Sequence, residues 1–255
     1  MSLAVDLYVH ANSWLHRLDP RVKLLGAVVG SLTAFLLPDA LALAVMLGAV
    51  VLVLWLGHIP APHIGWVLRS LLPLTLLILI IQPWFVVEGD TLAALGPARL
   101  TTGGLAAALT IAIRANVLAL LALMPLFATR QDDLVRGLVQ LGLPYTTGLT
   151  ITLALRYIPI AAGLYTTIKQ AQEARGLDLE SGNVLVRVRR FVPILTALVI
   201  ASVRLSDQLA MAMAVRGLNS GPRTERRQLH MTRRDWLAAG ALLGGAAVVL
   251  ALRVL

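Results

Sequence analysis

The chain of 255 residues contains no cysteine, which excludes disulfide bonds, thiolate nucleophiles and cysteine-ligated metal sites. Aromatic residues make up only 5% of the chain and do not interleave with the basic residues. The formal net charge of +9 therefore does not indicate a nucleic-acid partner. The sequence also lacks a G-x-x-x-x-G-K phosphate loop, an H-E-x-x-H pair and a nucleophile elbow. We expect a protein that is not an enzyme and does not itself hydrolyse ATP.

Charged residues are scarce as well, at 14%, whereas hydrophobic residues reach 58% and the mean hydropathy is +0.81. These values are typical of an integral membrane protein. The apolar residues form continuous runs without the alternation of a strand-built barrel, so we predict an all-α fold. Each run approaches the ~20 residues that span a ~30 Å hydrocarbon core. The runs predict a bundle of about five transmembrane helices at 22–37, 40–57, 67–87, 104–128 and 236–252.

The distribution of basic residues divides the chain into three parts. The N-terminal helices lie in 1–128 and a C-terminal transmembrane helix lies in 236–255. The part between them, 129–235, carries many of the arginines and is predicted to form a cytoplasmic helical domain. Arg17 and Arg21 precede the first apolar run, and short loops rich in Lys and Arg remain inside the cell. We therefore expect a multi-pass protein of the cytoplasmic membrane with a cytoplasmic N-terminus.

Two long helical patterns dominate the domain at 129–235, one from about 146 to 175 and one from about 192 to 216. Pro159 is expected to bend or break the first pattern, because proline removes one helix hydrogen bond. Pro193 fits a first-turn position of the second pattern. The residues between the two patterns are predicted to form a cytoplasmic turn.

Two further features of this domain are local. A short amphipathic helix is predicted at 131–141, where Asp132 and Asp133 occupy the first turn and favour a helix start rather than a metal site. Arg204 and Asp207 stand three positions apart in the second long pattern, so they can pair on one helix face.

The two long patterns end in the same way, with an arginine followed by glycine. Glycine readily takes the left-handed conformation that closes a helix, and a cation in the last turn is favoured by the helix dipole. Either ending alone is explained as a helix cap without a partner. Their repetition, 41 positions apart, predicts a paired device that presents two arginines to a common acidic partner; the residues are Ala174, Arg175, Gly176, Val215, Arg216 and Gly217.

These motifs, taken in order, resemble those of the transmembrane T component of energy-coupling factor (ECF) transporters, the EcfT, CbiQ and BioN family. The segment 12–23 is similar to the S-x-L-H-x-L-D-P-R-x-K entry to the first membrane helix of that family. Later signatures of the family are similar to segments of this chain at 129–144, 156–159, 171–176 and 211–217. The resemblance runs nearly from end to end.

The resemblance implies a scaffold subunit of an ECF-type ABC importer in a prokaryotic membrane. Its expected partners are two ABC ATPase subunits, which bind ATP and Mg, and a small membrane substrate-binding S component for a vitamin or for cobalt or nickel. The chain itself is expected to hold no cofactor. Arg175 and Arg216 would enter grooves on the ATPases, and Gly176 and Gly217 would allow close approach. The chain departs from the family at Val215, where alanine is usual.

Other residues are candidates for the subunit interface or for a structural role. Arg114 lies within a predicted span, where a charge costs roughly 2.5–3.5 kcal/mol. It is expected to face the bundle interior or an interface and could pair with a carboxylate such as Asp207. Met211 and Met213, with neighbouring leucines, are expected to hold the S component. The family signature adds Arg156 and Pro159.

Two alternatives remain open at this level. A self-sufficient secondary permease would use Arg114 and the pair Arg204 and Asp207 along a transport path, but no inverted internal repeat supports it. A membrane-embedded transferase or protease would need polar groups that converge, and no such set is recognisable. No metal site is expected, because His58 and His63 lack an obvious third ligand.

Overall fold

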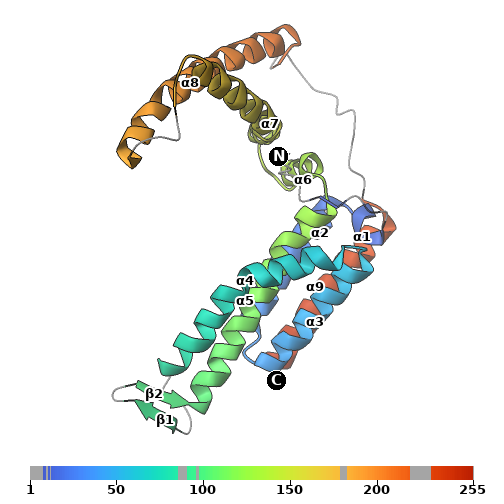
Figure 1. The fold of residues 1–255 in the computed structure, drawn as a ribbon. Coiled ribbons are helices and arrows are strands. Elements are labelled where there is room, and N and C mark those ends of the chain that lie inside the picture. The colour runs from blue at the N-terminus through green and yellow to red at the C-terminus, as the bar shows by residue number, and fades with distance from the viewer. Residues whose placement is uncertain are drawn as a thin grey trace. The chain divides into compact units, whose positions relative to one another are not determined.

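The computed structural model describes residues 8–9, 11, 13–85, 91–95, 98–178, 183–218 and 231–254. Contacts divide the chain into two compact units. One unit comprises 4–148 and 229–255, and the other comprises 149–228 with 1–3. The described part is built of helices and one small hairpin (Figure 1), which confirms the predicted helical membrane fold and adds the hairpin to it.

The larger unit contains the long apolar helices. They are α2 (Pro20–Leu36), α3 (Ala40–Leu56), α4 (Ala61–Ile81), α5 (Thr102–Ala128) and α9 (Arg233–Val254). Helix α4 begins six residues before the predicted run at 67–87, because prolines at the cap and in the first turn suit a helix start. By length and composition, three helical stretches of the described part can cross a membrane: Ala61–Trp84, Thr102–Ala128 and Tyr145–Ala174. The last of these lies in the part that had been predicted to form a cytoplasmic domain.

Helix α5 is the centre of this unit, because it packs against α2, α3 and α4, while α9 packs against α2. Its side chains Val117, Leu120 and Phe127 are fully buried, and between membrane helices such side chains stabilise the bundle by close packing rather than by transfer out of water. Many large apolar side chains on the outer faces remain exposed, as expected where lipid replaces water as the solvent. Examples are Leu41, Val45, Trp55, Trp66 and Ile80.

Buried polar groups join the ends of three helices of this unit. The Lys23 ammonium donates to the carbonyls of His16 and Ala128, at 3.2 and 2.9 Å, and to the Thr129 hydroxyl at 2.9 Å. The Asp235 carboxylate accepts hydrogen bonds from the backbone N–H of Asp19 at 2.8 Å and from Thr232. These bonds fix the beginning of α2, the end of α5 and the beginning of α9 to one another. The short helix α1 (Trp14–Arg17) contributes the His16 carbonyl.

The hairpin lies in the loop that had been predicted only as a connection. Strands β1 (Thr91–Leu95) and β2 (Ala98–Thr101) pair antiparallel, with Thr91 opposite Thr101. A short 3-10 helix, η1 (Gln82–Trp84), precedes the hairpin. The strand residues are mostly leucine and alanine, which have little intrinsic preference for strands, so the sequence pattern did not indicate them.

The smaller unit is formed by two long helices, α7 (Tyr145–Ala174) and α8 (Val184–Val215), although the first turn of α7 belongs to the larger unit. We had expected Pro159 to bend or break α7. The helix continues through this residue, so a break was wrong, and the bend stays a prediction. Helix α8 begins at Val184 rather than near 192, which places Pro193 in its interior and shortens the predicted turn. Both prolines are exposed, and each leaves one helix carbonyl without its usual donor.

Candidate functional site

The predicted helix ends have the same backbone geometry. At the end of α7, Gly176 has φ of 87° and donates to the Glu173 carbonyl at 2.9 Å, and Leu177 donates to the Gln172 carbonyl at 3.0 Å. This is the hydrogen-bond pattern of the Schellman motif, in which a left-handed glycine closes the helix. A residue with a side chain would be strained at this φ.

The end of α8 repeats the two hydrogen bonds of this motif. Gly217 has φ of 77° and donates to the Ala214 carbonyl at 3.0 Å, and Leu218 donates to the Met213 carbonyl at 3.0 Å. In both motifs the arginine occupies the C-cap, one residue before the glycine. Leucine follows each glycine, a repeat that the sequence contained and that sequence reasoning missed.

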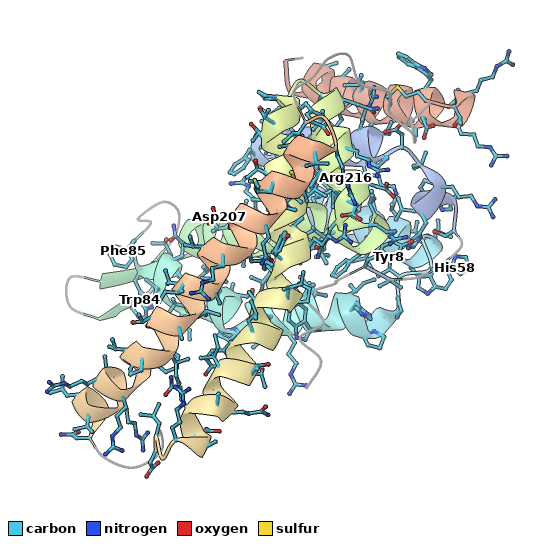
Figure 2. All side chains as sticks on the ribbon, turned by 90° about the horizontal axis from the view of Figure 1, so that it is seen from above. Tyr8, His58, Trp84, Phe85, Asp207 and Arg216 are labelled. Carbon is cyan, nitrogen blue, oxygen red and sulfur yellow. The ribbon has the colours of Figure 1, made fainter. Side chains whose placement is uncertain are left out.

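Arg175 and Arg216 are both exposed, and Figure 2 shows Arg216 at the end of its helix. Each guanidinium projects from a helix C-terminus, whose partial negative charge favours a cation. The guanidinium keeps its charge at physiological pH, and its planar fork can hold a carboxylate with two hydrogen bonds. Val215, the residue at which the chain departs from the family, is 89% exposed. Each end can therefore offer a cation beside a small apolar surface.

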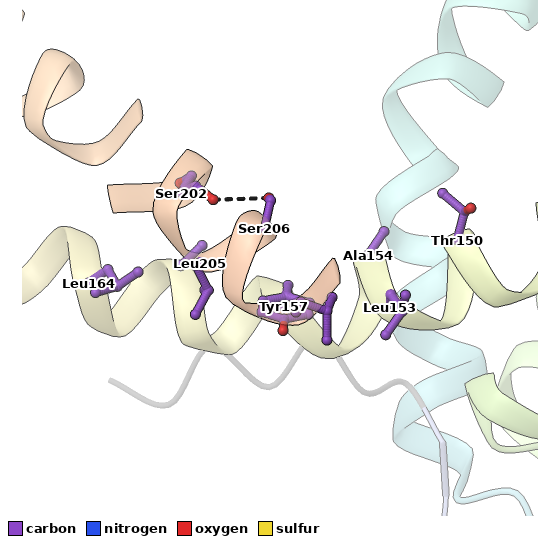
Figure 3. Close-up of a pocket in the computed structure, with 10 residues that line it drawn as sticks. Thr150, Leu153, Ala154, Tyr157, Leu164, Ser202, Leu205 and Ser206 are labelled. Carbon is purple, nitrogen blue, oxygen red and sulfur yellow. Dashed lines mark hydrogen bonds between the residues drawn. The ribbon is translucent and has the colours of Figure 1, made fainter. Parts of the chain in front are cut away.

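A groove of about 340 Å³ lies between α7 and α8 (Figure 3). It is mostly apolar, and the hydroxyl of Ser206 donates to the Ser202 carbonyl within its own helix at 2.9 Å. Of the residues predicted for the S-component surface, Leu205 and Leu209 line the groove and Met211 does not. The lining residues are Thr150, Leu153, Ala154, Tyr157, Ala161, Leu164, Ser202, Leu205, Ser206 and Leu209.

The other candidates of the smaller unit remain on its surface. Arg156, Arg204 and Asp207 are exposed, and Met211 is 72% exposed, whereas Met213 is half-buried. In the described part, Arg204 and Asp207 form no ion pair in this structure. The order of the charges explains this, since an acidic residue before a basic one suits the helix dipole better than the reverse.

Arg114 donates hydrogen bonds to backbone carbonyls at the end of α2. Its Nε donates to the Ala34 carbonyl at 3.1 Å and its Nη2 donates to the Leu37 carbonyl at 2.7 Å. In an α-helix the Ala34 carbonyl would accept from residue 38, which is a proline without an N–H. The arginine from α5 therefore satisfies the end of α2. Its suggested pairing with Asp207, which belongs to the smaller unit, stays a prediction.

The histidines considered for a metal site lie at the connection from α3 to α4. His63 packs edge-on against Phe127, with ring centroids 6.0 Å apart. His58 is exposed and has φ of 56° (Figure 2). The arrangement places one ring in a packing role and the other at a tight turn.

A bundle of apolar helices, with two further long helices that end in exposed arginines, defines a helical membrane protein. Residues 11–228 match the CbiQ family, described as cobalt transport protein. The energy-coupling factor transporter transmembrane protein EcfT of Lacticaseibacillus paracasei is 34% identical, over 98% of this chain and 98% of its own length. The EcfT proteins of Acidaminococcus fermentans and Streptococcus equi subsp. equi are 33% and 31% identical, over 94% and 92% of this chain and 93% and 91% of their own.

The chain therefore belongs to the family of transmembrane components of energy-coupling factor transporters. This places it among non-catalytic membrane subunits, in accord with its lack of nucleotide-binding and nucleophile motifs.

Proposed function

We propose that this subunit transmits the ATP-driven closure of two ABC ATPase subunits to a substrate-binding membrane subunit. The observation that carries the proposal is the duplicated helix end, in which two caps of the same motif each expose one arginine. One such cap needs no partner, but two caps at the ends of helices of similar length suit two similar grooves. The acidic side chains of these grooves would hold Arg175 and Arg216.

Transmission requires stiff elements between the ATPases and the membrane. Helix α7 has 30 residues and α8 has 32, which correspond to about 45 and 48 Å. When the two ATPase grooves approach each other, the arginines would follow them and the helices would move as rods. The groove between α7 and α8, with its leucines and alanines, would change shape in this motion and would contact the substrate-binding subunit.

The orientation and the substrate belong to the same proposal. The basic residues before α2 support a cytoplasmic N-terminus. In the proposed arrangement both arginine ends would lie on the same side, where ATP is available. The substrate-binding subunit selects the cargo, a vitamin or cobalt or nickel. The chain described here would serve any of these substrates, because its role is mechanical.

Co-purification with candidate ABC ATPases tests the proposal. The variants are Arg175→Glu, Arg216→Glu and the double change, and Arg233→Glu is the matched control because Arg233 is an exposed arginine at the start of α9. We expect each reversal at a helix end to weaken ATPase recruitment and the double change to abolish recruitment and ATP-driven uptake. The control should behave as the wild type.

The opposite result has a clear meaning. If the wild type recruits no ATPase, or if the helix-end reversals match the control, the coupling role is refuted. Uptake by the chain without ATPases would then favour the secondary permease.

A further inference from the structure

The beginning of α7 is held more tightly than the rest of that helix. Gly148 is buried, whereas the other described residues of α7 are half-buried or exposed. A Cβ atom at Gly148 would overlap Val139 Cγ2 of α6 (Gln131–Gln140) and would lie 3.7 Å from Val135 Cγ1. The two helices therefore meet where one has no side chain, so their backbones come closer than any larger residue would permit.

Helix α6 also packs against the first turn of α2. A Cβ atom at Gly137 would lie 3.1 Å from Pro20 Cβ and 3.6 Å from the Arg21 nitrogen. The Arg21 guanidinium donates twice to Gln140 Oε1, once from Nε at 2.7 Å and once from Nη2. Helix α6 thus contacts α2 through one face and α7 through another.

The connection between α6 and α7 is short and closed by hydrogen bonds. Gly142 has φ of 118°, and Leu143 donates to the Leu138 carbonyl at 3.1 Å. Helix α7 then starts within three residues, and Gly148 donates to the Pro144 carbonyl at 3.1 Å. Pro144 and these hydrogen bonds restrict the connection between α6 and α7 to few conformations.

We propose that Gly148 and Val139 are positioning residues. They fix the beginning of α7 on α6, and through α6 on α2. This inference rests on the proposed coupling function. From Gly148 to Arg175 the helix rises about 40 Å. If α7 tilts at Gly148, its displacement one helix turn (5.4 Å) from that residue becomes about seven times larger at Arg175, because Arg175 is about seven times farther away. If the beginning of α7 could move freely on α6, a displacement of Arg175 would not be transmitted to α2.

The test exchanges volume across the contact. In Gly148→Ala the added methyl group overlaps Val139. In Val139→Ala the smaller side chain leaves space for that methyl group. The double variant carries both changes. Gly163→Ala is the matched control, because Gly163 lies in the same helix with open space around its Cβ position. Each variant is assembled with the ATPases and the substrate-binding subunit in vesicles. ATPase recruitment, melting temperature and the substrate transported per ATP hydrolysed are measured.

We expect Gly148→Ala to lower the transport per ATP on the order of tenfold, while recruitment through the arginine ends changes less than about twofold. The double variant should recover most of the loss, and Gly163→Ala should match the wild type. A contact that serves only stability would lower the melting temperature without changing transport per ATP in the assembled complex.

The inference and the function on which it rests fail in different ways. If the wild type recruits ATPases and transports, but Gly148→Ala equals Gly163→Ala in transport per ATP, the positioning role is refuted and the coupling function stands. Absence of recovery in the double variant refutes it as well. If the wild type recruits no ATPase, the proposed function fails and the inference falls with it.

Discussion

Replacement of Lys23 by methionine tests whether the buried ammonium holds the helix ends of the larger unit together. Lys23 is 2% exposed and donates to three acceptors on α1 and at the end of α5. Methionine fills a similar volume but cannot donate a hydrogen bond. A buried acceptor left without a donor costs about 1–3 kcal/mol. Three acceptors at the lower value give a destabilisation of about 3 kcal/mol.

The assay is thermal unfolding of the purified protein in detergent, followed by the fluorescence of its five tryptophans. For a chain of this size 1 kcal/mol corresponds to about 2–4 °C in Tm, so Lys23→Met should melt about 6–12 °C below the wild type. Lys169, the other lysine of the chain, supplies the control. Its ammonium lies 3.5 Å from Glu173, and both side chains are exposed. Such a pair contributes only about 0–1 kcal/mol.

Lys23→Arg separates charge from geometry. Its guanidinium keeps the charge, but it is planar and cannot direct three hydrogen bonds as a tetrahedral ammonium does. We expect a loss of Tm intermediate between Lys169→Met and Lys23→Met. If Lys23→Met and Lys169→Met melt within about 1 °C of each other, the buried bonds do not stabilise the bundle and the reasoning is refuted.

Three further predictions concern other polar contacts and the helix ends. Burial lowers the pKa of His16 below 6.5. The hydrogen bond to the Val9 carbonyl raises this pKa, and the charges of nearby Lys23 and His58 lower it further. The unfolded chain then binds the proton first as pH falls through 6.5; Tm should drop in acid, and less so in His16→Gln. Arg114→Met removes both donors to the end of α2 and should cost about 1–3 kcal/mol in denaturant titrations. Gly217→Ala should lower Tm, since a left-handed residue with a side chain costs roughly 1–2 kcal/mol, whereas Gly163→Ala should not.

The parts that sequence reasoning predicted depend on nearby residues. The ends of α7 and α8 follow from an arginine and a glycine that stand next to each other, and the membrane helices follow from continuous apolar runs. The start of the short amphipathic helix near Gln131 is local as well, because Asp132 and Asp133 lie in its first turn. In each case the physical cause acts within about one or two helix turns.

The parts that sequence reasoning missed depend on partners far apart in the chain. Arg114 donates to the Ala34 carbonyl, 80 positions away. The proline at 38 leaves this carbonyl without a helix donor, but the sequence does not show which side chain replaces that donor. The contact of Gly148 with Val139 shows no pattern, because a single glycine in a helix is ordinary. The early start of α8 was missed because Pro193 fits a first turn as well as an exposed helix interior.

The repeated cap at Gly176 and Gly217 has a consequence for how many kinds of partner the chain requires. Both caps offer the same backbone and the same cation, so two copies of one ATPase could bind them equally well. A transporter with two distinct ATPases needs a feature that tells the ends apart. The residue before each arginine is such a feature, since Ala174 is small and Val215 is branched and almost fully exposed. If the proposed coupling function holds, exchange of these two side chains is expected to change which ATPase binds each end.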